Sequence, residues 1–130
     1  MIKQDYLIRM IQEIVASIVN AILNKKKIRL KDWEEYDAMT EQILGFPTKK
    51  LLNMSMPELL EKYKEDADRT DKIELAGINM LKLSEETEDN LLLSSRLRQD
   101  GIRLLKYVQK ESGAYSLQRE YLIKLLDTNG

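Results

Sequence analysis

Residues 5–23 read DYLIRMIQEIVASIVNAIL, and this stretch decides the fold. Its apolar residues return at spacings of three and four, which is the periodicity of a helix and not the alternation of a strand. These residues are Leu7, Ile8, Met10, Ile11, Ile14, Val15, Ile18, Val19, Ile22 and Leu23. Two apolar neighbours recur in nearly every turn, so the apolar face is wider than that of an ordinary surface helix. We therefore expect this helix to organise the fold, with more than one other element packed on it.

The composition is typical of a helical globular domain. Charged residues make up 33% of the 130 residues and hydrophobic residues 43%, with only five glycines and two prolines. A chain of this length is about one domain, and it can bury roughly two thirds of the surface of the unfolded chain. We therefore predict one all-α domain over residues 1–130, built from five or six antiparallel helices.

The sequence contains neither cysteine nor histidine. The missing cysteines exclude disulfides, thiolate nucleophiles and thiolate metal sites. The missing histidines exclude the commonest general base and the commonest transition-metal ligand. A P-loop, a Gly-x-Gly-x-x-Gly motif and a Gly-x-Ser-x-Gly motif are also missing from the sequence. We therefore expect a protein that is not an enzyme and that has no catalytic residues, no metal site and no cofactor.

Helix-start signals and apolar periodicity divide the rest of the chain. Asp32 with Glu35 and Ser55 with Glu58 have the spacing of a capping box, so each pair predicts the start of a helix. Apolar periodicity predicts three later helices. The first runs from about residue 72 to 86, the second begins after Asp89 or Asn90 and is ended by Ser112-Gly113, and the third runs from 114 to about 127. The resulting division is an N-terminal helical hairpin over residues 1–45, a bridge with a short helix over residues 46–68, and C-terminal helical hairpins over residues 69–130.

Two glycines fall inside the predicted C-terminal helices. Gly77 and Gly101 occupy helix interiors, where glycine costs about 1 kcal/mol relative to alanine. Both lie on apolar faces, so we predict that two helix backbones approach each other closely at these positions. The N-cap that we expect for the helix containing Gly77 is Thr70 or Asp71.

The sign of the charge alternates along the chain, although the net charge is only −1. Residues 1–31 carry +5, residues 65–90 carry −6 and residues 91–130 carry +3. Oppositely charged segments can neutralise one another within the fold or between subunits, which is the simplest interpretation of this pattern. The near-zero net charge argues against a general binder of polyanions.

A basic face is predicted on the helix that begins after Asp89 or Asn90. Its members recur at spacings of seven, three and four, and they are Arg96, Arg103, Lys106 and Lys110. Arg98 and Arg119 are expected to add to this surface. It can hold an acidic peptide, a terminal carboxylate or phosphates through charge-assisted hydrogen bonds. The alternative is a solvated face that pairs with the acidic segment before it. No aromatic residue is interleaved for base stacking, which argues against nucleic acid.

Other segments offer further contact surfaces. The wide apolar face of the first helix predicts self-association, for example as a homodimer, through Ile11, Ile14, Val15, Ile18, Val19 and Ile22. Residues 25–31 contain five basic residues, which either complement the dipole at the end of that helix or contact an anionic membrane or nucleic acid. We interpret Trp33 as hairpin packing, with a contact to a partner as the alternative.

Polar residues interrupt the first helix. Asp5, Arg9, Gln12 and Glu13 break the apolar run, which argues against a secretion signal and against a transmembrane segment. We therefore expect a cytoplasmic protein.

Residues 1–11, MIKQDYLIRMI, resemble the start of an uncharacterised bacterial family of small tetratricopeptide-like helical proteins, a domain of unknown function. That family opens with an Asp-Tyr-Leu-x-Arg-x-Ile helix, followed by several helical hairpins. The resemblance implies a fold and no assigned activity. Gly77 and Gly101 lie 24 residues apart, whereas the small positions of a 34-residue repeat lie about 12 apart. We therefore predict repeat-like helical hairpins and not a true repeat array.

These observations lead to an interaction or scaffold module that is not an enzyme and that binds a protein partner or a second copy of itself. The alternative is a peripheral binder of anionic membrane or nucleic acid that acts through residues 25–31.

Overall fold

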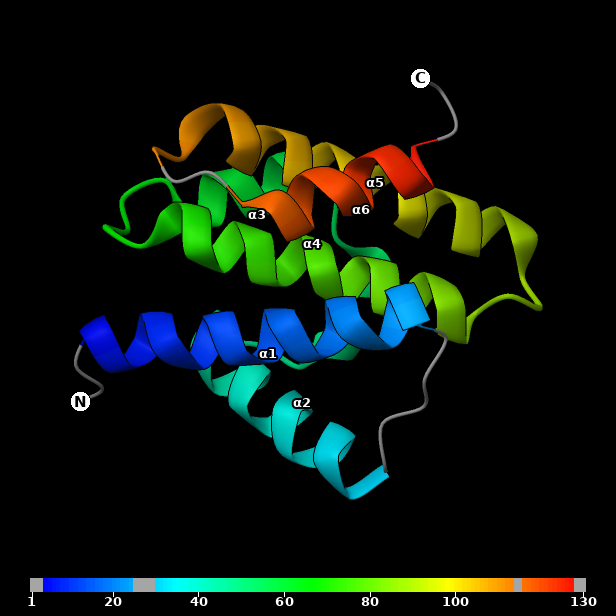
Figure 1. The fold of residues 1–130 in the computed structure, drawn as a ribbon, viewed down its shortest axis with the longest axis horizontal. Coiled ribbons are helices and arrows are strands. Elements are labelled where there is room, and N and C mark those ends of the chain that lie inside the picture. Colours follow the sequence, from blue (N-terminus) through cyan, green and yellow to red (C-terminus); the bar gives the residue numbers. More distant parts are fainter. Residues whose placement is uncertain (1–3, 25–29, 114–115, 128–130) are drawn as a thin grey trace.

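The computed structural model describes residues 4–24, 30–113 and 116–127, and the regular structure of these residues is entirely helical (Figure 1). The elements are α1 (Gln4–Asn24), α2 (Leu30–Leu44), the 3-10 helix η1 (Thr48–Asn53), α3 (Met56–Tyr63), α4 (Arg69–Glu86), α5 (Leu91–Glu111) and α6 (Leu117–Leu126). The predicted all-α class is therefore confirmed. Buried residues from all seven elements belong to one hydrophobic core.

Helix α4 takes the central place that we predicted for the first helix. It lies between α1 on one side and α5 with α6 on the other, and it also contacts α2, α3 and η1 (Figure 1). Eleven of its 18 residues are buried, whereas only 28% of the apolar stretch of α1 is buried. Polar residues interrupt the apolar pattern of α4, so the sequence does not indicate that this helix is buried. These residues can be buried because their polar groups have hydrogen-bond or ion-pair partners. For example, Asn79 Nδ2 donates to the Leu75 carbonyl at 2.9 Å.

The α4–α5 hairpin is built on the two glycines, as predicted. A Cβ atom added to Gly101 would lie 2.9 Å from the Gly77 carbonyl oxygen, and one added to Gly77 would lie 3.1 Å from Leu104 Cβ. The hydroxyl of Ser94 also donates to the carbonyl of Ser84 at 2.9 Å, near the turn of the hairpin. The two backbones therefore approach each other too closely for a larger residue at these positions.

The helix starts follow local capping chemistry in three cases. Ser55 and Glu58 form the predicted capping box at the start of α3. Asn90 caps α5 by accepting from the Leu93 amide at 3.1 Å, and Ser116 caps α6 by accepting from the Arg119 amide at 3.2 Å. The start of α6 is therefore Leu117, three residues after the predicted position.

Two predicted caps are wrong. Helix α2 begins at Leu30, so Asp32 lies inside the helix and is not its cap. Helix α4 begins at Arg69 after Asp68, which makes no capping hydrogen bond through its side chain. Thr70 and Asp71 therefore lie within the first turn of α4. In both cases the helix extends beyond the capping residue that we chose, because a side chain that can cap is equally tolerated in a first turn.

Helix α2 is fixed to α4 through an aromatic and charged cluster. The Lys82 ammonium lies 4.7 Å from the centre of the Trp33 ring, which meets Tyr36 edge to face. The same ammonium pairs with Asp37 at 3.4 Å and with Glu86 at 3.1 Å, so the nearly buried charge is compensated. Trp33 therefore packs within the fold, as we interpreted it from the sequence.

Candidate interaction site

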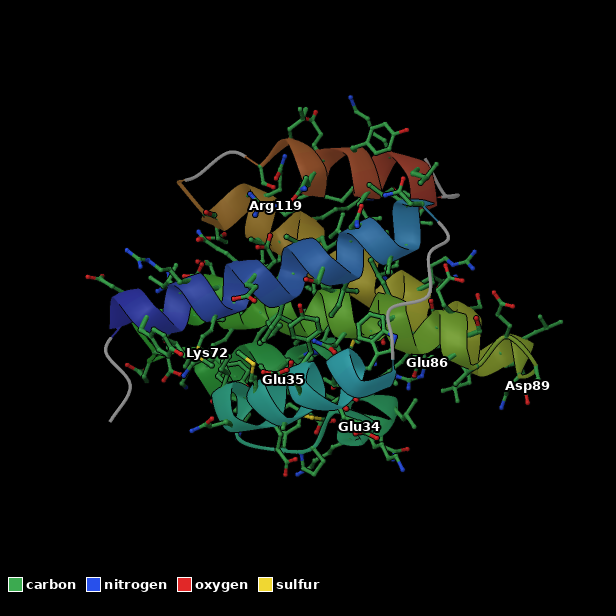
Figure 2. The ribbon with its side chains drawn as sticks, turned by 60° about the horizontal axis from the view of Figure 1, so that its bottom comes forward. Glu34, Glu35, Lys72, Glu86, Asp89 and Arg119 are labelled. Atoms are coloured by element: carbon green, nitrogen blue, oxygen red, sulfur yellow. The ribbon has the colours of Figure 1, made fainter. Side chains whose placement is uncertain are left out.

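Carboxylates in the described part of the chain do not form groups of three or more that could hold a metal ion. Figure 2 shows Glu34 and Glu35 on α2, and Asp89 at the far end of the α4–α5 hairpin. Glu86 lies nearer α2, because Lys82 pairs with both Glu86 and Asp37. This distribution directs attention to surfaces and not to an enclosed site.

The apolar face of α1 is mostly inside the fold. Ile11, Ile14, Ile18 and Val19 are at most 1% exposed, whereas Val15 and Ile22 are half-buried. Four of the six residues that we proposed for self-association are therefore core residues, because α4 covers the face that they form. A contact between two copies would need other side chains in this fold.

By length and composition alone, α1 is apolar enough over Asp5–Asn24 to cross a membrane. In the structure, its inner face packs on α4, α2 and α6. The neighbouring basic segment is outside the described residues at positions 25–29, as are the side chains of Leu30 and Lys31. The structure thus describes no contact of that segment.

The predicted basic face lies on α5, but its members have different surroundings. The Arg96 guanidinium donates to the Leu52 carbonyl and pairs with Asp100 at 3.4 Å. Arg103 pairs with the other oxygen of the same Asp100 at 3.6 Å, and Lys106 pairs with Asp127 at 2.5 Å. None of these acids belongs to residues 65–90, so the expected pairing with the preceding acidic segment is wrong for these three residues.

Lys110 and Arg98 differ from these paired residues. Lys110 is exposed and Arg98 is half-buried, and neither has an ion-pair partner within the described residues. Their charges are therefore available to an incoming anionic group. The Lys106 side chain is half-exposed, although its partner Asp127 is mostly buried, so this ammonium is accessible to an incoming anionic group but is already paired.

Arg119 is not part of the basic face. Its side chain is only 6% exposed and lies under the start of α6 (Figure 2). Nη1 lies 2.5 Å from Glu74 Oε2, and Nε donates to Gln109 Oε1 at 2.6 Å. Arg119 therefore joins α6 to α4 and α5, which corrects its predicted position on the surface.

Two hollows lie between α5 and α6, and we call them together the α5/α6 groove. One hollow of about 360 Å³ is lined by Lys106, Gln109, Lys110, Glu120, Ile123 and Lys124. A second hollow of about 230 Å³ is lined by Arg98, Gln99, Ile102, Arg103, Lys106, Leu126 and Asp127. Lys106 belongs to both hollows, so they adjoin. The lining contains five cationic side chains and two acidic ones.

The groove gathers three of the four residues predicted for the basic face. Arg103, Lys106 and Lys110 line it, whereas Arg96 points instead toward η1, where it binds Leu52. Lys124 and Ile123 of α6 also line the groove, but they were not predicted from the sequence. Periodicity places residues on a face of their own helix, but it gives no information on which helix packs beside that face.

Comparison with protein-family models, with curated proteins and with solved structures finds no match. The resemblance of residues 1–11 to a tetratricopeptide-like family therefore stays a prediction.

Proposed function

We propose that this protein is an interaction module without enzymatic activity, and that it binds an acidic segment of a protein partner in the α5/α6 groove. The observation that supports the proposal is that five cationic side chains and two acidic ones line the two hollows of the groove. Lys110 and Arg98, which lack ion-pair partners within the described residues, are the anchor points for carboxylates.

The groove is lined by both apolar and charged side chains. Ile102 and Ile123 contribute apolar surface, and the methylene stems of Lys106, Lys110 and Lys124 extend it while their ammonium groups stay at the rim. A segment with apolar side chains toward the floor and carboxylates toward the rim complements both features. Such a segment gains charge-assisted hydrogen bonds at the rim and buries apolar area at the floor.

A polyanion such as nucleic acid matches the groove less well. Glu120 and Asp127 stand among the basic residues and would repel a continuous row of phosphates. The residues lining the groove include no aromatic ring on which a base could stack. The groove therefore favours a ligand that has spaced carboxylates and apolar groups between them.

The test is fluorescence anisotropy with a labelled peptide that contains four glutamates around a pair of leucines. We expect Lys106→Glu/Lys110→Glu to weaken binding by roughly tenfold or more, because each substitution replaces attraction with repulsion. The matched control is Lys49→Glu/Lys64→Glu, which makes the same change in net charge at two exposed lysines outside the groove. It should bind the peptide like the wild type.

Equal weakening in the control would contradict the proposal, because the effect would then come from net charge alone. Tighter binding of anionic vesicles or DNA than of the peptide, unchanged by the groove variant, would favour the rival binder acting through residues 25–31. Circular dichroism of both variants checks that the helices are intact.

A further inference from the structure

We propose that the occupant of the α5/α6 groove is the turn between α4 and α5 of a second copy of this chain, so that copies assemble head to tail. This inference rests on the proposed function, because it names the acidic segment that the groove binds. We call the turn with its flanking residues the acidic tip, and it comprises Glu86, Glu88, Asp89, Leu91 and Leu92.

The acidic tip has the two features that the groove complements. Leu91 and Leu92 are 79% and 87% exposed, the highest values among the large hydrophobic residues that are exposed in the described part of the chain. Glu88 and Asp89 are exposed as well, and only Asn90 separates them from the leucines. The tip lies at one extremity of the molecule, where it protrudes beyond the other helices (Figures 1 and 2). Two adjacent leucines in such a position are typical of a contact surface.

The charges of the tip are not neutralised by the basic residues of the groove in the same copy. Glu86 pairs with Lys82 of its own helix, and within the described residues Glu88 and Asp89 have no ion-pair partner. On the other side, Arg103 and Lys106 pair with Asp100 and Asp127. The acidic end of the hairpin and the basic groove thus remain two complementary surfaces on one molecule.

One copy cannot fill the whole of its own groove with its own tip. Leu91 and Leu92 of the tip belong to α5, the uninterrupted helix that also forms one wall of the groove. Along this helix Arg98 follows Leu92 by six residues, about 9 Å, and Lys110 follows it by 18 residues, about 27 Å. The tip therefore could reach the Lys110 end of its own groove only if α5 were broken. A second copy can present its tip without any change in either fold.

The proposed contact joins two different surfaces. Each copy carries one tip and one groove, so a single contact between two copies leaves one free tip and one free groove. Further copies can add at both ends, and the mean mass should rise with concentration instead of stopping at a dimer. Because the contact area is small and the groove is charged, the association should be weak and should decrease with added salt.

The experiment is light scattering with size-exclusion chromatography over a concentration series. The tip variant is Glu88→Gln/Asp89→Asn/Leu92→Gln, and the groove variant is Lys106→Glu/Lys110→Glu. All substituted side chains are exposed, so both variants should keep the fold, which circular dichroism checks. We expect the wild type and the Lys49→Glu/Lys64→Glu control to grow in mass, and each variant alone to stay near the 15.2 kDa of one chain.

An equimolar mixture of the two variants gives the sharpest result. The groove variant supplies an intact tip and the tip variant supplies an intact groove, so one native contact can form and no more can follow. We therefore expect a mixture that stops at the mass of two chains. A contact between two identical patches would not be restored by mixing.

Three outcomes separate this inference from the proposed function. If the wild type stays monomeric at every concentration while the acidic peptide still binds, head-to-tail assembly is wrong and the groove proposal stands. If the wild type assembles but the mixture stays monomeric, the copies meet elsewhere and the inference is again wrong. If the peptide binds the groove variant as well as it binds the wild type, the proposed function itself is wrong.

Discussion

At the scale of single residues, the surroundings of Asp71 change the pKa of its carboxyl group. It lies half-buried in the first turn of α4, beside a hollow of about 270 Å³ that Glu74 and Arg119 also line. Burial raises the pKa of Asp71 above its usual value of 3.8, and the neighbouring Asp68 raises it further, while Arg119 acts in the opposite direction. The folded state thus holds the proton of Asp71 more tightly than the unfolded state does.

The raised pKa predicts a pH-dependent effect of Asp71→Asn. The favourable contribution of the protonated carboxyl is complete below pH 3.8 and is lost as pH rises through the pKa of the folded state. At neutral pH the ionised Asp71 therefore destabilises the fold. We expect Asp71→Asn to raise Tm at pH 7 by on the order of 2 °C, with a smaller gain at pH 3.

Differential scanning calorimetry at the two pH values checks this prediction. Asp5→Asn is the control, because Asp5 is an exposed acid in the first turn of α1 and should gain no stability when its charge is removed. A lower Tm for Asp71→Asn at pH 7 would show that the carboxylate is stabilised in the first turn of α4 and not penalised there.

At the scale of the elements, the α4–α5 hairpin depends on backbone contact. In an unpacked helix, Gly101→Ala would stabilise by about 1 kcal/mol. Here the new Cβ would lie 2.9 Å from the Gly77 carbonyl and 3.0 Å from Leu81 Cδ2, so the helices must separate. We expect Gly101→Ala to lower the free energy of unfolding by about 1–3 kcal/mol in urea titrations.

Gly113→Ala is the matched control for this substitution, because no heavy atom lies within 4 Å of the added Cβ. Its free energy of unfolding should stay within about 0.5 kcal/mol of the wild-type value. A Gly101→Ala variant as stable as the Gly113→Ala variant would mean that α4 and α5 can move apart at no cost.

The elements that the sequence predicts well are those with a local cause. The capping box of Ser55 with Glu58 marks the start of α3, and Asn90 and the apolar repeats that follow it mark the start of α5, both of which the structure confirms. The place of α4 could not be predicted in this way, since Asn79 and Lys82 interrupt its apolar pattern. Asn79 is buried with a partner in its own helix, the Leu75 carbonyl, whereas Lys82 pairs with Asp37 of α2, which local spacing does not reveal.

The residues of the candidate site also fall into those that local spacing predicts and those that it does not. Arg103, Lys106 and Lys110 were predictable because they share one face of one helix. Ile123 and Lys124 were not, because they reach the groove only when α6 folds back on α5. The position of α6 depends on Arg119, whose contacts with Glu74 and Gln109 join three helices and have no signature in the sequence.

At the scale of the whole molecule, α1 has two incompatible interpretations. Its wide apolar face predicts self-association from the sequence, whereas the structure covers Ile11, Ile14, Ile18 and Val19 with α4 and its neighbours. Head-to-tail assembly through the acidic tip needs α1 only as part of the core. A substitution on its inner face should therefore change folding, and a substitution on its outer face should change neither folding nor assembly.

Ile18→Asp tests this distinction. Ile18 is 1% exposed, so the substitution places an uncompensated carboxylate in the core, at a cost of several kcal/mol. A domain of this size is stable by about 5–15 kcal/mol, so the substitution should remove a large part of that stability and lower the melting temperature steeply. Circular dichroism should show the loss of helix at a lower temperature, while Ala16→Asp on the exposed side of α1 should keep both the helix signal and the mass of the wild type. A folded Ile18→Asp variant with a smaller mass than the wild type would instead make α1 the contact between copies.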